Sequence, residues 1–132
     1  MNFMSNPYSD QLNKYKSVDI QTRIEAATPH ELIELLLQGA RNHISSATGY
    51  MNNKNMKDKG EHLGKAMDII ENLKTSIDQQ KGGDVAVSLM QFYTSIQGLL
   101  LNANLNNDED LLIRANDLLA EILEAWRAIK PK

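Results

Sequence analysis

Apolar residues recur at intervals of three and four over most of the chain, the spacing that places side chains on one face of an α-helix. Short polar or glycine-containing stretches interrupt this pattern. No stretch shows the apolar and polar alternation of a β-strand. The pattern predicts four helices at about residues 29–50, 56–80, 84–103 and 108–129. Because a few residues join each pair, consecutive helices are expected to run antiparallel.

Signals for helix starts and stops agree with these boundaries. Thr28 and Glu31 have the spacing of a capping box around Pro29 at the first helical position. Gly82-Gly83 is expected to end the second helix, with Asp84 opening the third. The last helix is expected to bury a seam of Leu111, Ala115, Leu118, Ile122, Ala125 and Ile129. The predicted fold is all-α, an antiparallel up-and-down four-helix bundle with a short N-terminal helical segment.

The N-terminal segment, residues 1–27, differs from the predicted bundle at 28–132. After Asn6-Pro7, a helix-start signal, Tyr8, Leu12 and Tyr15 form a short apolar stripe at i, i+4 and i+7. One or two helical turns are marginally stable in water on their own. We therefore expect this segment to dock on the bundle, either permanently or as a lid that a partner displaces.

The third predicted helix carries the most unusual stretch of the sequence. The 23 residues from Val85 to Asn107 include no charge, although charged residues make up 23% of the chain. Apolar side chains spread over roughly 200° of its circumference, whereas a helix packed on one side needs an arc only a little above ~100°. The central seam comprises Ala86, Leu89, Tyr93, Ile96, Leu100 and Ala103.

This wide face has two interpretations. In the first, neighbouring helices cover both flanks of the seam. In the second, one flank lines a groove for a foreign apolar segment. We predict a groove lined by Val85, Leu89, Phe92, Ile96 and Leu99. The circumference alone does not decide the flank, and the side with Met90 and Leu101 is the alternative.

Composition excludes several classes of partner. The chain of 132 residues has no cysteine, a net charge of −3 and no basic stripe, so we expect no disulfide and no nucleic acid partner. Ten residues of the uncharged stretch are Ser, Thr, Gln, Asn or Gly, which argues against membrane insertion. The start has no signal-peptide pattern, which makes the cytoplasm the expected location.

No motif indicates catalysis. His30-Glu31-Leu32-Ile33-Glu34 resembles a zinc-protease motif but ends in Glu where the second His ligand belongs, so we expect no metal there. His62 lies near a glycine and a lysine, as in histidine phosphotransfer bundles, but their order does not suit that motif, which favours a solvated histidine. We expect no enzyme activity and no cofactor, and hence a binding protein.

Several motifs taken in order resemble the flagellar export chaperones, the FliS-like family specific for flagellin. The matching stretches are Asn6-Pro7-Tyr8, Ala27-Thr28-Pro29-His30-Glu31-Leu32, Lys65-Ala66-Met67-Asp68-Ile69-Ile70, Gly82-Gly83-Asp84-Val85-Ala86, Phe92-Tyr93 and Ala125-Trp126. The resemblance implies a cytoplasmic helical bundle that binds the disordered C-terminal segment of flagellin. It also implies that the bundle prevents premature polymerisation and delivers flagellin to the type III export apparatus.

The resemblance further implies that the N-terminal segment covers part of the client's site. The chain departs from the family near Gly98 and Leu99, where many members carry basic residues, and at Ser95, where a Tyr is frequent. This difference favours an apolar contact through Leu99. Two rival interpretations are a phosphotransfer bundle that uses His62 and a structural bundle that self-associates through the wide apolar face. A homodimer is left open.

Overall fold

The computed structural model describes residues 22–130. Its long helices are α2 (Pro29–Asn52), α3 (Met56–Thr75), α4 (Gln79–Asn106) and α5 (Glu109–Ala128), with a helical turn at residues 22–26 before them. No β-strand occurs between residues 22 and 130. The described residues divide into two units, with the boundary between Leu32 and Ile33. The predicted all-α fold is confirmed.

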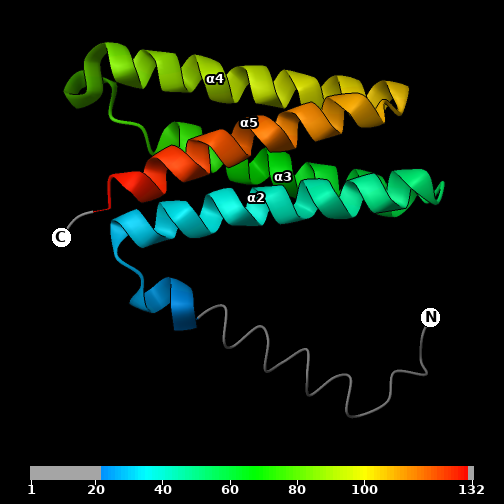
Figure 1. The fold of residues 1–132 in the computed structure, drawn as a ribbon, viewed down its shortest axis with the longest axis horizontal. Coiled ribbons are helices and arrows are strands. Elements are labelled where there is room, and N and C mark those ends of the chain that lie inside the picture. The colour runs from blue at the N-terminus through cyan, green and yellow to red at the C-terminus, as the bar shows by residue number, and fades with distance from the viewer. Residues whose placement is uncertain (1–21, 131–132) are drawn as a thin grey trace. The chain divides into compact units, whose positions relative to one another are not determined.

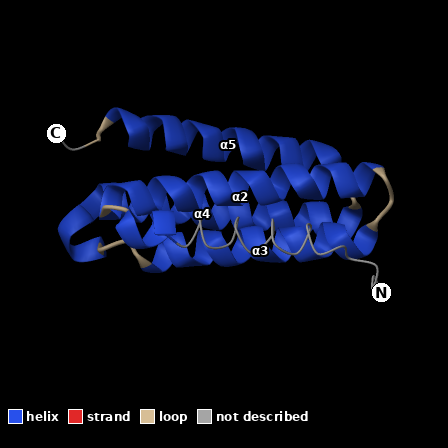
Figure 2. Cartoon of the chain, turned by 90° about the horizontal axis from the view of Figure 1, so that it is seen from below, coloured by secondary structure: helices blue, strands red, loops and turns tan. Residues whose placement is uncertain are grey.

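The helices of the larger unit run antiparallel to their neighbours (Figures 1 and 2). Near one end of the bundle, the Arg127 side chain of α5 donates to Glu34 of α2. At the other end, Asn52 of α2 donates to Glu109 of α5 across 3.2 Å. Since the start of α2 meets the end of α5 and the reverse, these two helices run in opposite directions, as an up-and-down bundle requires.

The core is built from small and large apolar residues at helical spacing on each helix. The buried set comprises Leu37, Ala40, Ile44, Ala47 and Met51 of α2, Leu63, Ala66, Ile70 and Leu73 of α3, Ala86, Tyr93, Ile96, Leu100 and Ala103 of α4, and Leu112, Ala115, Leu119 and Leu123 of α5. All of these except Ala86 belong to one continuous cluster. On α4 the buried set reproduces the predicted seam apart from Leu89, which is half-buried.

The seam predicted for the last helix was only partly right. Ala115 is buried as predicted, and Leu112 and Leu119, which were expected to widen the seam, are its centre. Leu112 and Leu119 are fully buried, whereas Leu111, Leu118 and Ile122 are half-buried beside them. The apolar face of this helix is wide enough to admit either register. The packing of its neighbours selects the one centred on Leu112, Ala115 and Leu119.

The connection between α3 and α4 also differs from the prediction. α3 ends at Thr75 rather than near residue 80, and a short helical piece from Gln79 precedes the predicted break at Gly82-Gly83. The Asp78 carboxylate accepts a hydrogen bond from the backbone N–H of Lys81 at 3.1 Å, so Asp78 starts this short piece. Gly83 then interrupts it with φ 55° and ψ −132°, a conformation that glycine adopts readily.

Lys59 joins the start of α3 to the end of α4. It is a buried lysine with an exposed fraction of 4%. Its Nζ donates to the backbone oxygen of Asn104 at 3.1 Å and to Asn107 Oδ1. Asn107 has φ 50°, which ends α4 in the left-handed conformation. The ammonium group thereby satisfies carbonyl oxygens at the negative end of the α4 dipole.

Candidate functional site

The residues predicted to line a groove do not share one open surface. Ile96 is completely buried in the core and does not line an open surface in this structure, and its contact with a partner stays a prediction. Leu89, Phe92 and Leu99 are half-buried and pack against the core cluster. Val85 is 76% exposed, because it lies next to the kink at the start of α4. Whether Leu89, Phe92 and Leu99 contact a partner stays a prediction.

An open apolar surface lies on the other flank of α4. We call it the outer stripe, and its members are Val87, Met90, Thr94, Gly98, Leu101 and Leu105. They follow one another at intervals of three and four residues, so they share one face of the helix. Val87 is 46% exposed, Leu101 48% and Leu105 70%. The outer stripe is the flank that the sequence left as the alternative.

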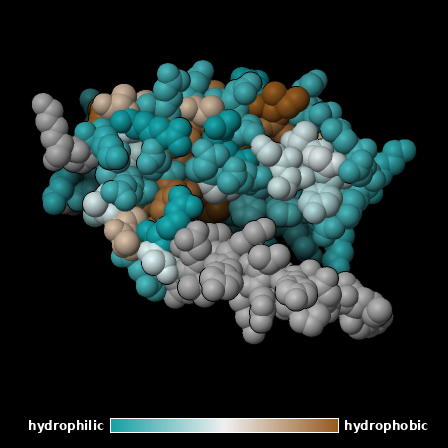
Figure 3. Space-filling model, turned by 60° about the horizontal axis from the view of Figure 1, so that its bottom comes forward, coloured by the Kyte–Doolittle hydropathy of each residue, from teal (hydrophilic) through white to brown (hydrophobic). Residues whose placement is uncertain are grey.

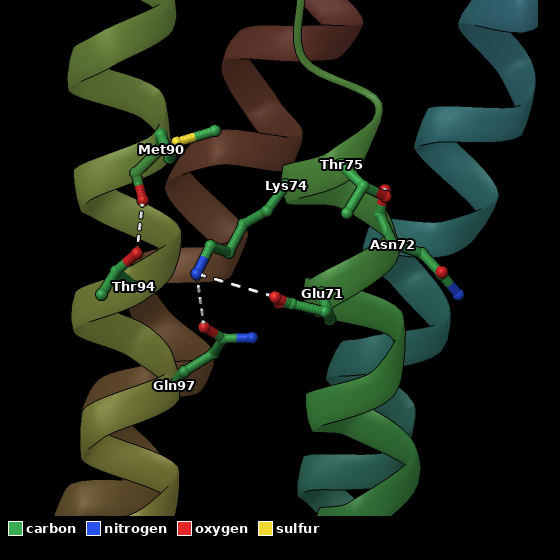
Figure 4. A network of polar contacts seen from close by, with 7 residues as sticks. All are labelled: Glu71, Asn72, Lys74, Thr75, Met90, Thr94 and Gln97. Atoms are coloured by element: carbon green, nitrogen blue, oxygen red, sulfur yellow. Dashed lines mark hydrogen bonds and ion pairs between the residues drawn. The ribbon is translucent and has the colours of Figure 1, made fainter.

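The backbone of α4 increases the apolar character of this face. The Thr94 hydroxyl donates back to the carbonyl oxygen of Met90 at 2.9 Å, so its hydrogen bond is satisfied within the helix (Figure 4). A Cβ atom placed on Gly98 would meet nothing within 4 Å. A shallow hollow of about 390 Å³ on this face is lined by Val87, Met90, Gln91, Thr94 and Ser95. The stripe therefore offers methyl groups and bare backbone to an incoming segment, with the polar side chains of Gln91 and Ser95 beside it.

A lysine of the neighbouring helix α3 lies beside this surface. Lys74 of α3 donates from Nζ to Gln97 Oε1 of α4 at 3.0 Å (Figure 4). The same ammonium forms a long ion pair with Glu71 Oε1 at 3.9 Å. Gln97 is three residues from Thr94 and four from Leu101, so Lys74 lies at the edge of the outer stripe.

A cluster of ring side chains links α2 to α3. His43 Nδ1 and His62 Nδ1 lie 2.9 Å apart, and the Tyr50 ring stacks on His62 with centroids separated by 5.4 Å. Burial lowers the pKa of His43, and the nearby charges of His62 and Lys65 lower it further. His62 is therefore a paired and stacked side chain, unlike the solvated histidine that the sequence favoured.

The remaining predicted features concern the N-terminal segment, metal binding and the membrane. Tyr8, Leu12 and Tyr15 lie outside the described residues. Between residues 22 and 130 no three His, Asp or Glu side chains gather as metal ligands would. No helix in that range is long and apolar enough to cross a membrane. The exposed face in Figure 3 is mostly hydrophilic, with apolar side chains in separate patches.

The chain is similar to known proteins over nearly its whole length. Residues 11–132 match the family model described as flagellar protein FliS. The flagellar secretion chaperone FliS of Salmonella typhimurium is 38% identical over 122 residues, which cover 92% of this chain and 90% of that protein. The Vibrio cholerae protein of the same name is 35% identical, covering 92% and 89% respectively. The chain therefore belongs to the FliS family of flagellar secretion chaperones, which are not enzymes.

Proposed function

We propose that this chaperone binds the disordered C-terminal segment of flagellin in the cytoplasm. Binding would prevent premature polymerisation and deliver flagellin to the type III export apparatus. Family membership and the open apolar face of α4 support this function. A segment that polymerises through apolar faces needs an apolar surface to cover those faces while it waits for export.

The observation that carries the proposal is the contrast between α4 and its neighbours. Exposed positions of α3 and α5 are largely charged, namely Lys57, Glu61, Lys65, Asp68 and Glu71 on α3 and Asp110, Arg114, Asp117, Glu121 and Glu124 on α5. The outer stripe instead exposes Val87, Leu101 and Leu105. Single exposed apolar residues are common, but a row of them along one helix is typical of an interaction surface.

We propose the outer stripe as the primary contact for the client. A client helix with apolar residues at i, i+3, i+4 and i+7 would place them along Val87, Met90 and Leu101. The flank of Phe92 and Leu99 remains a second proposed contact, reached if the client wraps around α4. We further propose that Tyr8, Leu12 and Tyr15 act as a lid that the client displaces.

Calorimetry with a C-terminal flagellin peptide tests the function and locates the contact. We expect the wild-type chain to bind with a strongly negative heat-capacity change, because apolar surface is buried and the peptide folds. Leu101→Asp should abolish binding and leave thermal unfolding nearly unchanged, because Leu101 is half exposed. Ile113→Asp on α5, at a residue 46% exposed, is the matched control and should bind normally.

Leu99→Asp separates the two flanks. If Leu99→Asp abolishes binding without loss of stability while Leu101→Asp binds normally, the client uses the Phe92 and Leu99 flank. Deletion of residues 1–15 should speed association if these residues form a lid, whereas slower binding would make them part of the site. A wild-type chain that does not bind the peptide would contradict the proposed function itself.

Self-association is a second candidate function, and the same outer stripe favours it. Two copies could cover their stripes against each other and form a homodimer. Light scattering across a range of concentrations distinguishes the two cases. A mass that rises toward twice 14.8 kDa, and falls again in Leu101→Asp, would identify the stripe as a homodimer interface.

A further inference from the structure

We propose that Lys74 forms an ion pair with a carboxylate of the bound segment and thereby fixes the register of that segment on α4. This inference rests on the proposed function and deepens it by naming a chemical requirement on the client. The requirement is an amphipathic segment with an acidic group at the border of its apolar face.

Lys74 lies between the end of α3 and the outer stripe of α4. Its side chain extends from the last turn of α3 toward α4, and Figure 4 places Nζ between the levels of Thr94 and Gln97. The side chain is 19% exposed, compared with 54% for Glu71. The Lys74 side chain is thus mostly buried at the edge of the outer stripe, while about half of the Glu71 side chain is exposed.

The Lys74 ammonium has few partners within the described structure. An ammonium group has three donors. Within the described structure, one of them bonds to the neutral oxygen of Gln97 at 3.0 Å, and Glu71 Oε1 lies at 3.9 Å, beyond hydrogen-bond distance. The remaining exposed part of Lys74 faces solvent. The part of α4 that carries the outer stripe offers no carboxylate, because residues 85–107 are uncharged and the one acid of α4, Asp84, precedes them.

A client that covers the outer stripe would change the surroundings of Lys74. A client helix packed on Thr94 and Leu101 would exclude water from the adjoining Lys74. In the described structure its ammonium has one long ion pair, with Glu71 at 3.9 Å, and a buried charge with so little compensation is strongly unfavourable. A carboxylate on the client removes this penalty, because charge-assisted hydrogen bonds are short and strong. A client that lacks this group would be disfavoured, so Lys74 contributes specificity in addition to affinity.

The carboxylate has two possible sources on a C-terminal segment, an Asp or Glu side chain or the terminal α-carboxylate. Both would present the same chemistry to Lys74. Three synthetic forms of the flagellin C-terminal peptide distinguish them: the free acid, the C-terminal amide, and the amide with its Asp and Glu residues replaced by Asn and Gln.

The test compares Lys74→Met with the wild-type chain by calorimetry using the free-acid peptide. Met keeps much of the apolar stem and removes the charge. We expect Kd to rise at least tenfold, since truncating one partner of a buried ion pair commonly has an effect of that size or more. Lys74→Arg should bind close to wild type. Lys57→Met, at an exposed position on the same helix, is the matched control and should have no effect.

The peptide forms identify the partner of Lys74. Loss of wild-type affinity on amidation alone would identify the α-carboxylate, and loss only in the Asn and Gln form would identify a side chain. In either case that peptide should bind wild type and Lys74→Met equally. Equal affinity of wild type and Lys74→Met for the free-acid peptide would overturn the inference while leaving the proposed function intact. Absence of binding to wild type would instead refute the proposed function.

A structural role for Lys74 predicts a different result. If Lys74 only holds α3 against α4, Lys74→Met should lower thermal stability and weaken all three peptides by the same factor. If it pairs with the client, increasing salt should weaken wild-type binding more than binding to Lys74→Met, because salt screens the ion pair. The salt dependence therefore separates the two roles even if the variant is somewhat less stable.

Discussion

Replacing Lys59 by Met tests whether a buried charge stabilises the junction of α3 and α4. Lys59 is 4% exposed, and its Nζ contacts Asn104 O at 3.1 Å and Asn107 Oδ1. A hydrogen bond to a charged group contributes about 1.5–3 kcal/mol. Met removes two such bonds but also removes the desolvation penalty of the ammonium. We expect the free energy of unfolding to fall by about 2 kcal/mol.

Circular dichroism during thermal and urea unfolding measures this change. A loss of about 2 kcal/mol corresponds to a decrease in Tm of roughly 6–10 °C for a domain of this size. Lys57→Met lies in the same helical turn at an exposed position and should leave Tm within about 1–2 °C of wild type, since surface substitutions have small effects. The urea m-value should not change, because the surface exposed on unfolding is nearly the same.

A double-mutant cycle attributes the effect to the hydrogen bonds. Asn107→Gly removes the side-chain acceptor and keeps a residue that tolerates φ 50°. The Lys59→Met and Asn107→Gly effects should be less than additive, because each variant breaks the same contact. A Lys59→Met protein as stable as wild type, or more stable, would refute the reasoning and show that apolar packing suffices at this site.

Three further results follow from other parts of the bundle. The depressed pKa of His43 means that the unfolded chain binds more protons near the ordinary value of 6.5, so stability should fall as pH drops below about 6.5, and His43→Gln should reduce this slope in thermal melts. Burial raises the pKa of Tyr93 to about 12 from 10.0, so stability should be lost as pH rises from 10 to 12, and Tyr93→Phe should flatten that loss. Gly98→Ala and Gly64→Ala, both at positions open to a Cβ, should each stabilise the chain by about 0.5–1 kcal/mol, and only Gly98→Ala should weaken a client packed on the outer stripe; equal binding by both would place the client elsewhere.

Much of the fold could be predicted because local signals and apolar spacing agree along the chain. The backbone N–H of Glu31 bonds to the Thr28 hydroxyl at 3.1 Å, as the capping box requires. The predicted seam of the uncharged helix coincides with the buried residues Tyr93, Ile96 and Leu100. In these places one set of residues satisfies both the helix and the core, so one structure is strongly favoured.

The errors occur where two local solutions compete. Asp78 and Asp84 are both acids that could start a helix. Asp78 starts a short helical piece that the sequence analysis assigned to the end of the second helix, and the kink at Gly83 separates this piece from the long part of α4. In the last helix Leu111 and Leu112 both suit a buried seam. Spacing within one helix cannot choose between such solutions, because the choice depends on where the neighbouring helices pack.

The candidate site was only partly predictable for the same reason. The sequence identifies α4 as the helix with excess apolar circumference, but the positions of α3 and α5 determine which flank they cover. Lys74 gave no signal of its own, because a lysine in the last turn of a helix is ordinary dipole compensation. Its relation to the outer stripe emerges only when α3 is placed beside Gln97.

The composition of α4 separates the demands of folding from those of binding. The core requires apolar residues at Tyr93, Ile96 and Leu100, but it places no such requirement on exposed positions such as Leu101 and Leu105. Charged residues there would be compatible with a bundle, as exposed positions of α3 and α5 demonstrate. Exposed apolar side chains also favour aggregation of a free chain. Stability of the isolated bundle therefore does not account for the uncharged face, which is the feature that the proposed client contact would explain.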